Sequence, residues 1–172
     1  MSILAIIPAR GGSKRLKNKN LRLFRGKPLV TWAIEQAEGS KLITRIVVSS
    51  DSPKILKLAG PYALKRPSYL SQDSSTSESC IVHALYSLPL PHLFILLQPT
   101  SPLRTSEDID ACLKIALEHG SCNSSSSHTP NGACHAHHSK SFLSSLSLHS
   151  PFLYPMSHSL DINTEEDLNS DS

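Results

Sequence analysis

The chain has 172 residues, of which 39% are hydrophobic and 18% are charged, and its formal net charge at pH 7 is +3. This length suits one domain with a substantial hydrophobic core. The apolar run at the amino terminus is far shorter than a membrane span and lacks the features of a signal peptide, so we expect a cytoplasmic protein with no membrane partner. The four cysteines form no C-x-x-C pair, which favours reduced thiols over disulfides or a zinc site.

Charge and composition change near residue 120. Residues 1–120 contain 16 Lys or Arg and 9 Asp or Glu, a balance of +7, whereas residues 121–172 contain one Lys and five acids, a balance of −4. Fifteen of the last 52 residues are serine and six are histidine, and apolar periodicity fades there. We therefore expect a single domain over 1–172, with its core in 1–120 and with part of 121–150 loosely ordered.

The first predicted strand leads into a glycine-rich basic loop. Residues 2–9 form an apolar run typical of a strand buried on both faces of a parallel sheet. Arg10-Gly11-Gly12-Ser13-Lys14-Arg15 follows directly. Its glycines can adopt positive φ and let backbone N–H groups approach an anion, while its cations neutralise that anion. The pattern predicts a phosphate-binding loop, although it matches neither a P-loop nor a dinucleotide-binding motif.

Eight Lys or Arg and no acid occur between Arg10 and Lys27. A solvated basic surface, a nucleic-acid patch and a mononucleotide site are the three interpretations of such a run. Phe24 is the only aromatic residue in it, which disfavours stacking on the bases of a single strand. Because the run follows the first strand, and ligands of open α/β sheets bind at the carboxyl ends of strands, we favour a mononucleotide and expect no nucleic-acid partner.

Strands and helices alternate up to residue 120. The predicted strands after the first are 45–50 and 93–97, and the predicted helices are 29–38, 53–59, 78–88 and one that ends near Gly120. Thr105 or Ser106 can cap the last helix, whose first turn also carries two acids that complement the helix dipole. This alternation predicts a three-layer α/β fold with a mostly parallel sheet.

The turns that follow the second and third strands are polar. Ser49-Ser50-Asp51 follows one strand, and Gln98-Pro99-Thr100-Ser101-Pro102-Leu103-Arg104 follows the other. The prolines stiffen the second turn and fix the directions of its side chains. Ordinary turn chemistry explains each turn alone, but their expected convergence at one edge of the sheet favours a binding site.

Six motifs occur along the chain in the order Ile6-Ile7-Pro8-Ala9-Arg10-Gly11-Gly12-Ser13-Lys14, Lys19-Asn20-Leu21, Gly26-Lys27-Pro28-Leu29, Val48-Ser49-Ser50-Asp51, Lys65-Arg66-Pro67 and Leu97-Gln98-Pro99-Thr100-Ser101-Pro102-Leu103-Arg104. Together they resemble the motifs of the acylneuraminate cytidylyltransferases, the enzymes that make CMP-sialic acid. The resemblance covers residues 1–120 and returns at 153–156 and 159–168. It implies a nucleotidyltransferase-like αβα domain that transfers CMP from CTP to a nine-carbon 2-keto acid sugar and releases pyrophosphate.

The resemblance also implies the roles of individual residues. Arg10 and Lys19 would hold the triphosphate and act in catalysis with Asp161. Gln98 would reach the acidic keto-sugar, with Thr100 and Ser101 beside it. The implied nucleotide-binding residues are Ala9, Arg10, Gly11, Gly12, Ser13, Lys19, Asn20, Arg66 and Ser77.

Two features depart from the family pattern. The family has a D-x-D pair that carries Mg²⁺. Here Asp161 is the first residue of that pair, and Asn163 takes the place of the second aspartate. Because Mg²⁺ prefers carboxylates, we expect this change to weaken the metal site. Thr164 and Asp167 also suit a capping box, which would make this segment a helix start.

Before Asn131-Gly132-Ala133 the family has a further strand and an arm with sugar-binding cations and much of the dimer contact, whereas this chain has only residues 121–130. We therefore expect the family's homodimer to be weakened or absent.

The motifs described above leave two alternatives to a sialic acid enzyme open. A sister enzyme would activate legionaminic, pseudaminic or ketodeoxyoctulosonic acid, since the motifs up to Arg104 mainly contact the nucleotide. A shortened protein that binds a cytidine nucleotide without turnover is the other alternative, and the deletion and Asn163 are the reasons to consider it.

Overall fold

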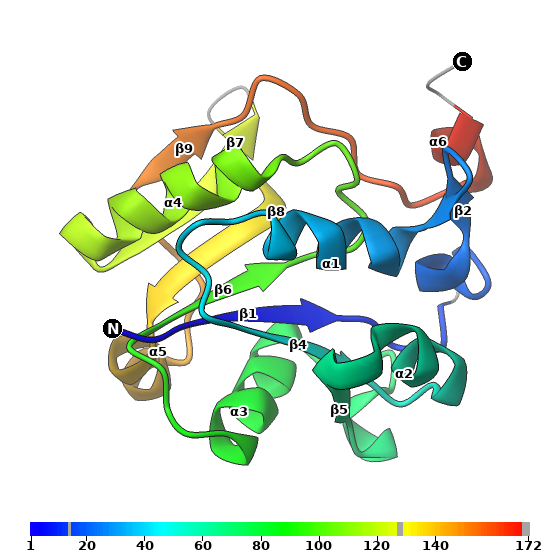
Figure 1. Cartoon of the computed structure of the whole chain (residues 1–172), viewed down its shortest axis with the longest axis horizontal. Helices are drawn as coiled ribbons and strands as arrows, with labels where there is room; N and C mark the ends of the chain where they lie inside the picture. The colour runs from blue at the N-terminus through cyan, green and yellow to red at the C-terminus, as the bar shows by residue number, and fades with distance from the viewer. Residues whose placement is uncertain (14, 127–128, 170–172) are drawn as a thin grey trace.

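A seven-stranded sheet forms the centre of the protein (Figure 1), in a computed structural model that describes residues 1–13, 15–126 and 129–169. Lys14 of the basic loop lies outside the described residues. The strand order is β5-β4-β1-β6-β8-β7-β9. The strands are β1 (Ile3–Pro8), β4 (Arg45–Ser50), β5 (Ala63–Lys65), β6 (Leu93–Leu97), β7 (Ser121–Ser126), β8 (Thr129–His138) and β9 (Leu153–Pro155). Only β8 among these strands runs antiparallel to its neighbours, so the sheet is mostly parallel as predicted.

Helices cover both faces of this sheet. One face packs against α1 (Leu29–Glu38), α2 (Pro53–Ala59) and α4 (Ser106–His119), and the other against α3 (Ser77–Ser87) and α5 (Ser139–Ser145). Alternate residues of β1 serve the two faces, because successive side chains of a strand point to opposite sides. Both faces of β1 are therefore buried, and the three-layer αβα fold predicted from the sequence is confirmed.

Shorter elements gather at the end of the molecule toward which β1 runs (Figure 1). They are the 3-10 turn η1 (Lys19–Leu21), the hairpin of β2 (Leu23–Phe24) and β3 (Lys27–Pro28), and the short helix α6 (Glu165–Asn169). Two further 3-10 turns, η2 (Gly60–Tyr62) and η3 (Ser68–Leu70), flank β5. A small core that includes Leu16, Phe24, Leu29 and Ile162 joins the basic loop, the hairpin and the carboxyl-terminal segment.

Each element predicted within 1–120 is present, with boundaries that agree to within one residue. The Thr105 side chain accepts a hydrogen bond from the backbone N–H of Asp108, whose carboxylate accepts one from the N–H of Thr105. This capping box confirms the predicted start of α4.

The segment 121–150 differs from the expectation of loose order. Most of its described residues form β7, β8 and α5, so regular structure extends through much of this segment. The strands bury small side chains, with Cys122, Cys134 and Ala136 fully inaccessible beneath α4. The hydroxyl of Ser124 accepts a hydrogen bond of 2.7 Å from the backbone N–H of Cys134. The sheet accommodates these serines and cysteines for two reasons. Strand β6 supplies an apolar edge, and neighbouring backbone groups form hydrogen bonds with the serine hydroxyl groups.

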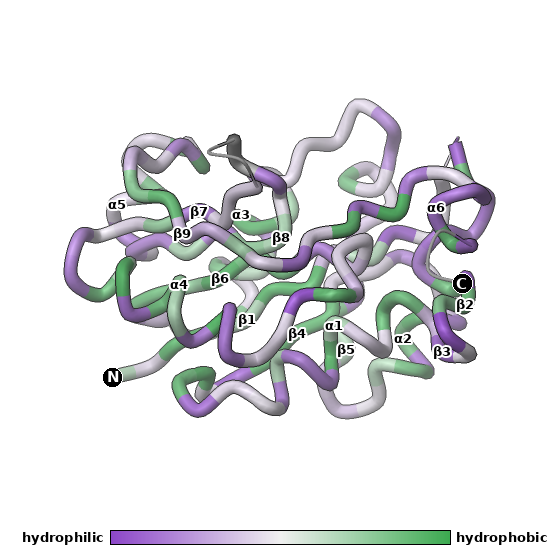
Figure 2. Tube along the Cα trace, turned by 90° about the horizontal axis from the view of Figure 1, so that it is seen from above, coloured by the Kyte–Doolittle hydropathy of each residue, from purple (hydrophilic) through white to green (hydrophobic). Residues whose placement is uncertain are grey.

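Hydrophobic residues concentrate in the central strands and in the sides of helices that face them, while hydrophilic residues occupy the peripheral loops (Figure 2). Within residues 1–13, 15–126 and 129–169, no helix has the length and apolar character needed to cross a bilayer.

Candidate functional site

The glycine-rich loop is fixed by contacts with the end of β4. The N–H of Ala9 donates to the carbonyl of Ser49 over 2.9 Å, and the N–H of Gly11 donates to Oδ1 of Asp51 over 2.8 Å. A side chain at Gly11 would place its Cβ 3.0 Å from the Cβ of Ser52, a tight contact, so glycine favours the close approach of the two loops. Neither Gly11 nor Gly12 has positive φ, which corrects the conformational role expected from the sequence.

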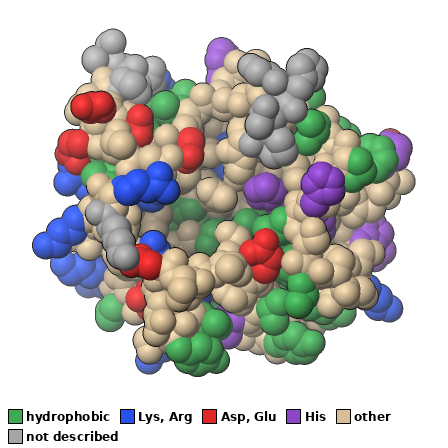
Figure 3. Space-filling model, turned by 180° about the vertical axis from the view of Figure 1, so that it is seen from behind, with side chains coloured by type: hydrophobic (Ala, Val, Ile, Leu, Met, Phe, Trp, Pro, Cys, Tyr) green, Lys and Arg blue, Asp and Glu red, His purple; other side chains and the backbone are tan. Residues whose placement is uncertain are grey.

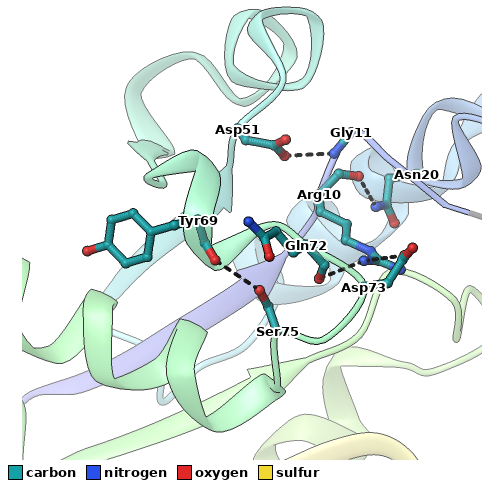
Figure 4. A network of polar contacts seen from close by, with 8 residues as sticks. All are labelled: Arg10, Gly11, Asn20, Asp51, Tyr69, Gln72, Asp73 and Ser75. Carbon is teal, nitrogen blue, oxygen red and sulfur yellow. Dashed lines mark hydrogen bonds and ion pairs between the residues drawn. The ribbon is translucent and has the colours of Figure 1, made fainter.

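Arg10 is held between the glycine loop and the loop that precedes α3 (Figure 4). Its Nη1 lies 2.9 Å from Oδ1 of Asp73 and donates to the carbonyl of Gln72 over 3.0 Å. Its backbone carbonyl accepts a hydrogen bond from the amide of Asn20. The Arg10 side chain is about one-third exposed and lines a cavity, so it is anchored through Nη1 and still accessible to a ligand.

Lys19 connects the basic loop to the carboxyl-terminal segment. Its Nζ donates to Oδ1 of Asn163 over 3.1 Å, and Nδ2 of Asn163 donates to Asp161 over 2.6 Å. Partial burial lowers the pKa of the Lys19 ammonium, and the Asp161 carboxylate opposes this change. Buried Ile162 anchors the segment in the small core while its two neighbours lie near Lys19.

Arg66 follows β5 and is 5% exposed. Its Nη2 donates to the carbonyl of Ser49, and its buried Nε has no hydrogen-bond partner among the described residues. A buried cation with an unsatisfied donor beside a cavity is suited to bind an anion.

Burial raises the pKa of the neighbouring Cys80 thiol, which therefore stays protonated and is a poor nucleophile.

The turn after β6 presents Gln98 and Thr100 to the same space. The carbonyl of Thr100 accepts a hydrogen bond from the N–H of Ile162, which ties the turn to the carboxyl-terminal segment. Ser101 is 5% exposed and lies beneath the turn. Arg104, which is 2% exposed, donates to the carbonyl of Gln98 and to Oε1 of Gln36. These contacts make the turn rigid.

A cavity of about 350 Å³ brings half of the predicted site residues together. The predicted residues that line it are Arg10, Lys19, Asn20, Arg66, Ser77, Gln98 and Thr100. An adjoining hollow of about 320 Å³ adds Gly12 and Ser13. Four cations and one acid line the two spaces among the described residues, so the site favours anions. Figure 3 shows Lys and Arg side chains gathered on one side of this face, beside a hollow near its middle.

Some predicted residues lie outside this cavity. Ala9 and Gly11 support the loop through their backbones, and Ser101 is buried behind the turn. Asp161 and Asn163 reach the site through Lys19. A larger hollow of about 760 Å³ lies at the opposite ends of β1 and β6, but Lys140 is the only Lys or Arg that lines it among the described residues, so we favour the smaller cavity as the anion site.

Sequence reasoning missed Arg15, Asp73 and Thr76, which also line the cavity. The signal for Arg15 was its place in the basic run. Asp73 and Thr76 sit in a serine-rich loop with no distinguishing pattern, and only the fold brings that loop to Arg10.

The carboxyl-terminal oxygens offer partial support for a magnesium ion. Asp161 and Asn163 supply one carboxylate and one amide oxygen, the hard ligands that Mg²⁺ prefers. The amide of Asn163 directs its nitrogen at Asp161 and its oxygen at Lys19, so metal binding requires that amide to rotate and Lys19 to change partner. Asp167 caps α6 through the N–H groups of Asn163 and Thr164, which confirms the predicted capping box. Among the described residues, no three His, Cys, Asp or Glu side chains are grouped to hold a metal.

The sequence model of the family described as Cytidylyltransferase matches residues 4–147. The chain belongs to the cytidylyltransferase family. The chain is 42% identical over 123 residues to the CMP-N,N'-diacetyllegionaminic acid synthase of Legionella pneumophila, a match that covers 67% of this chain and 53% of that protein. It is 41% identical over 116 residues to the N-acylneuraminate cytidylyltransferase of Escherichia coli O18:K1:H7, covering 66% of this chain and 28% of that protein.

The match to a pseudaminic acid cytidylyltransferase of Campylobacter jejuni is 43% identical over 89 residues and covers 49% of this chain and 38% of that protein. The chain thus spans about half the length of the legionaminic acid relative, and less of the other two. Its fold resembles that of CMP:2-keto-3-deoxy-manno-octonic acid synthetase complexed with CTP, with a TM-score of 0.80, 15% identity and coverage of 99% of this chain and 96% of that one. This structural likeness concerns the fold alone.

Proposed function

We propose that the protein transfers CMP from CTP to a nine-carbon 2-keto acid sugar of the sialic acid type and releases pyrophosphate. The observation that carries this proposal is the convergence of Arg10, Lys19 and Arg66 with Gln98 on one cavity. The cations suit a triphosphate, and the amide suits the hydroxyl and carboxyl groups of a sugar acid. The relatives named for legionaminic, acylneuraminic and pseudaminic acids support this acceptor class.

In the proposed reaction, the anomeric hydroxyl of the sugar attacks the α-phosphorus in line. Arg10 and Lys19 hold the triphosphate and balance the negative charge that moves to the leaving pyrophosphate. Gly12, Ser13 and Asn20 shape the loop around the nucleotide, and Gln98 orients the acceptor. Magnesium, held by Asp161 and Asn163, would supply further neutralisation of the phosphates. Protonated Cys80 takes no part, because a direct displacement needs no protein nucleophile.

The decisive experiment is a measurement of pyrophosphate release from CTP with a panel of acceptors. The panel contains N-acetylneuraminic, legionaminic, pseudaminic and ketodeoxyoctulosonic acids. Release with N-acetylneuraminic acid supports the proposal, and release with only one of the other sugars identifies a sister enzyme. Binding of CTP without release for any sugar overturns the enzymatic proposal and favours a cytidine-nucleotide-binding protein, the alternative suggested by Asn163 and the missing arm.

The substitution Asn163→Asp is expected to tighten Mg²⁺ binding to the CTP complex about tenfold. A second carboxylate replaces a neutral amide and removes the nitrogen that now faces Asp161, and one charge-assisted contact is worth about 1.5 kcal/mol at its lower end. Repulsion between the two carboxylates in the absence of metal limits the gain. Asp161→Ala is expected to abolish the binding. Titration of Mg²⁺ against the CTP-bound protein measures both effects.

Glu166→Gln provides the matched control, because Glu166 is an exposed acid of the same segment. It should leave the Mg²⁺ affinity unchanged. If Asn163→Asp and Asp161→Ala also leave the Mg²⁺ affinity unchanged, the segment serves only as the cap of α6.

We also predict that the protein is largely monomeric at micromolar concentration. The resemblance assigns much of the dimer contact to an arm that precedes Asn131, and the sequence has only residues 121–130 at this place. Light scattering across a dilution series measures the mass directly. A dimer that persists on dilution would contradict the prediction and place the interface elsewhere on the surface.

A further inference from the structure

Strand β8 holds the backbone of Gln98. Nη1 of the buried Arg104 donates to the carbonyl of Gln98 over 3.2 Å and to the carbonyl of Ala133 over 2.5 Å. Nη2 of Arg104 donates to Oε1 of Gln36, which fixes the guanidinium from the side of α1. The end of β6 and the middle of β8 are therefore joined through one side chain, and the Cα of Gln98 has a fixed place at the mouth of the cavity.

The side chain of Gln98 lies against Gly132. A Cβ added at Gly132 would be 3.3 Å from Nε2 and 3.6 Å from both Cδ and Oε1 of Gln98. Because the three atoms are nearly equidistant, the plane of the amide faces the glycine. Gly132 also has a φ of +75°, a conformation that residues with a side chain rarely adopt. A side chain at this position would crowd the amide, which would have to shift by a few tenths of an ångström.

The amide of Gln98 is available to a ligand. Within the part of the chain that the structure describes, its oxygen and nitrogen make no hydrogen bond to protein, although the residue lines the cavity with the cations. Its position is thus set by packing on Gly132 and by the Arg104 contact to its backbone, rather than by polar partners of its own. A small movement at residue 132 would therefore move the amide without disturbing Arg10 or Lys19.

We propose that Gly132 is a positioning residue for the acceptor sugar. The lack of a side chain at residue 132 lets the Gln98 amide lie flat on β8, which sets the place at which it donates to and accepts from the hydroxyl and carboxyl groups of a keto-acid sugar. This inference rests on the proposed function for the identity of the acceptor. Its structural part, the dependence of the Gln98 amide on Gly132, stands independently of turnover.

The test compares Gly132→Ala with Gly26→Ala. Gly26 has a φ of +76°, and a Cβ built there meets nothing within 4 Å, so the two variants share the backbone strain and only Gly132→Ala adds a contact with Gln98. We expect Gly132→Ala to raise the KM for the acceptor tenfold or more and to leave the KM for CTP within twofold. Gly26→Ala should change neither constant. Gly132→Asn is the second variant, because asparagine tolerates positive φ better than alanine and still adds a side chain.

A second readout follows the amide itself. The side-chain N–H₂ resonances of Gln98, assigned by their loss in Gln98→Leu, should shift in ¹⁵N-labelled Gly132→Ala and stay unchanged in Gly26→Ala. In the Gln98→Ala background, Gly132→Ala should have no further effect on the KM for the acceptor. Unchanged resonances, or equal increases in both KM values, would overturn the inference. Failure of the wild-type protein to release pyrophosphate would overturn the proposed function alone, since the resonance shift needs no turnover.

Discussion

Replacement of Arg10 by alanine is expected to weaken CTP binding by about 1.5–3 kcal/mol, roughly 10- to 150-fold. The substitution removes a charge-assisted donor to the triphosphate and leaves the Asp73 carboxylate, now its ion-pair partner, without that cation in the cavity. Lys19→Ala should cause a loss in the same range, because its ammonium group lines the same cavity. Calorimetry with CTP measures both losses.

Arg45→Ala is the matched control for the removal of positive charge. Arg45 starts β4 at the opposite end of the sheet and donates to the carbonyl of Pro89 on the surface. Its loss should leave CTP affinity unchanged. The same calorimetry should show tighter binding of CTP than of ATP or GTP. Equal affinities for ATP and CTP, or no effect of either cavity substitution, would contradict the assignment of this cavity to the nucleotide.

Acid is expected to destabilise the protein through His137, by about 3 kcal/mol between pH 6.5 and pH 4. His137 is 5% exposed, and its ring stacks on Phe94 at a centroid distance of 5.9 Å. Burial and then the nearby His135 lower the pKa of His137 from its ordinary value of 6.5 to about 4. Because the folded-state pKa is lower than the unfolded one, the unfolded state takes up protons first as the pH falls. The contribution to stability is complete above pH 6.5 and is lost progressively down to pH 4.

His137→Phe should reduce this dependence while it preserves the stacking on Phe94 and the tilted ring contact with Phe142. The measurement is the free energy of unfolding in urea at pH 7.5 and at pH 4, for the wild type and the variant. His158→Phe, at an exposed position, is the control and should behave as the wild type does. A variant that loses as much stability in acid as the wild type would show that other groups dominate the acid response.

The amino-acid sequence by itself determined the longer helices and strands of residues 1–120, whereas the short strands β2, β3 and β5 were not predicted. Apolar runs such as 93–97 specify strands buried on both faces, and the capping boxes at Thr105 and Thr164 specify helix starts. These signals act over a few residues, so they can be recognised without knowledge of the fold. The basic loop after the first strand likewise indicated where anions bind, since parallel strands place their carboxyl ends at one edge.

The order of residues 121–150 was decided by tertiary structure. The serines and cysteines of β7 and β8 have no strand signal of their own, and they form strands because β6 offers an unpaired apolar edge and α4 covers their small side chains. Local propensity could not reveal this, because the stabilising partners are distant in the sequence.

For the site as well, the sequence indicated individual residues and the tertiary structure decided their arrangement. The sequence indicated Arg10, Lys19, Arg66 and Gln98 as individual binding residues, and the structure places all four on one cavity. Their environments depend on contacts between distant segments: the Arg10 side chain meets a loop 62 residues away, and Lys19 meets Asn163 over a separation of 144 residues. Such pairs are set by the order of strands in the sheet and by the return of the carboxyl-terminal segment to the first loop. Short-range sequence patterns carry no record of either, so only the tertiary structure determined them.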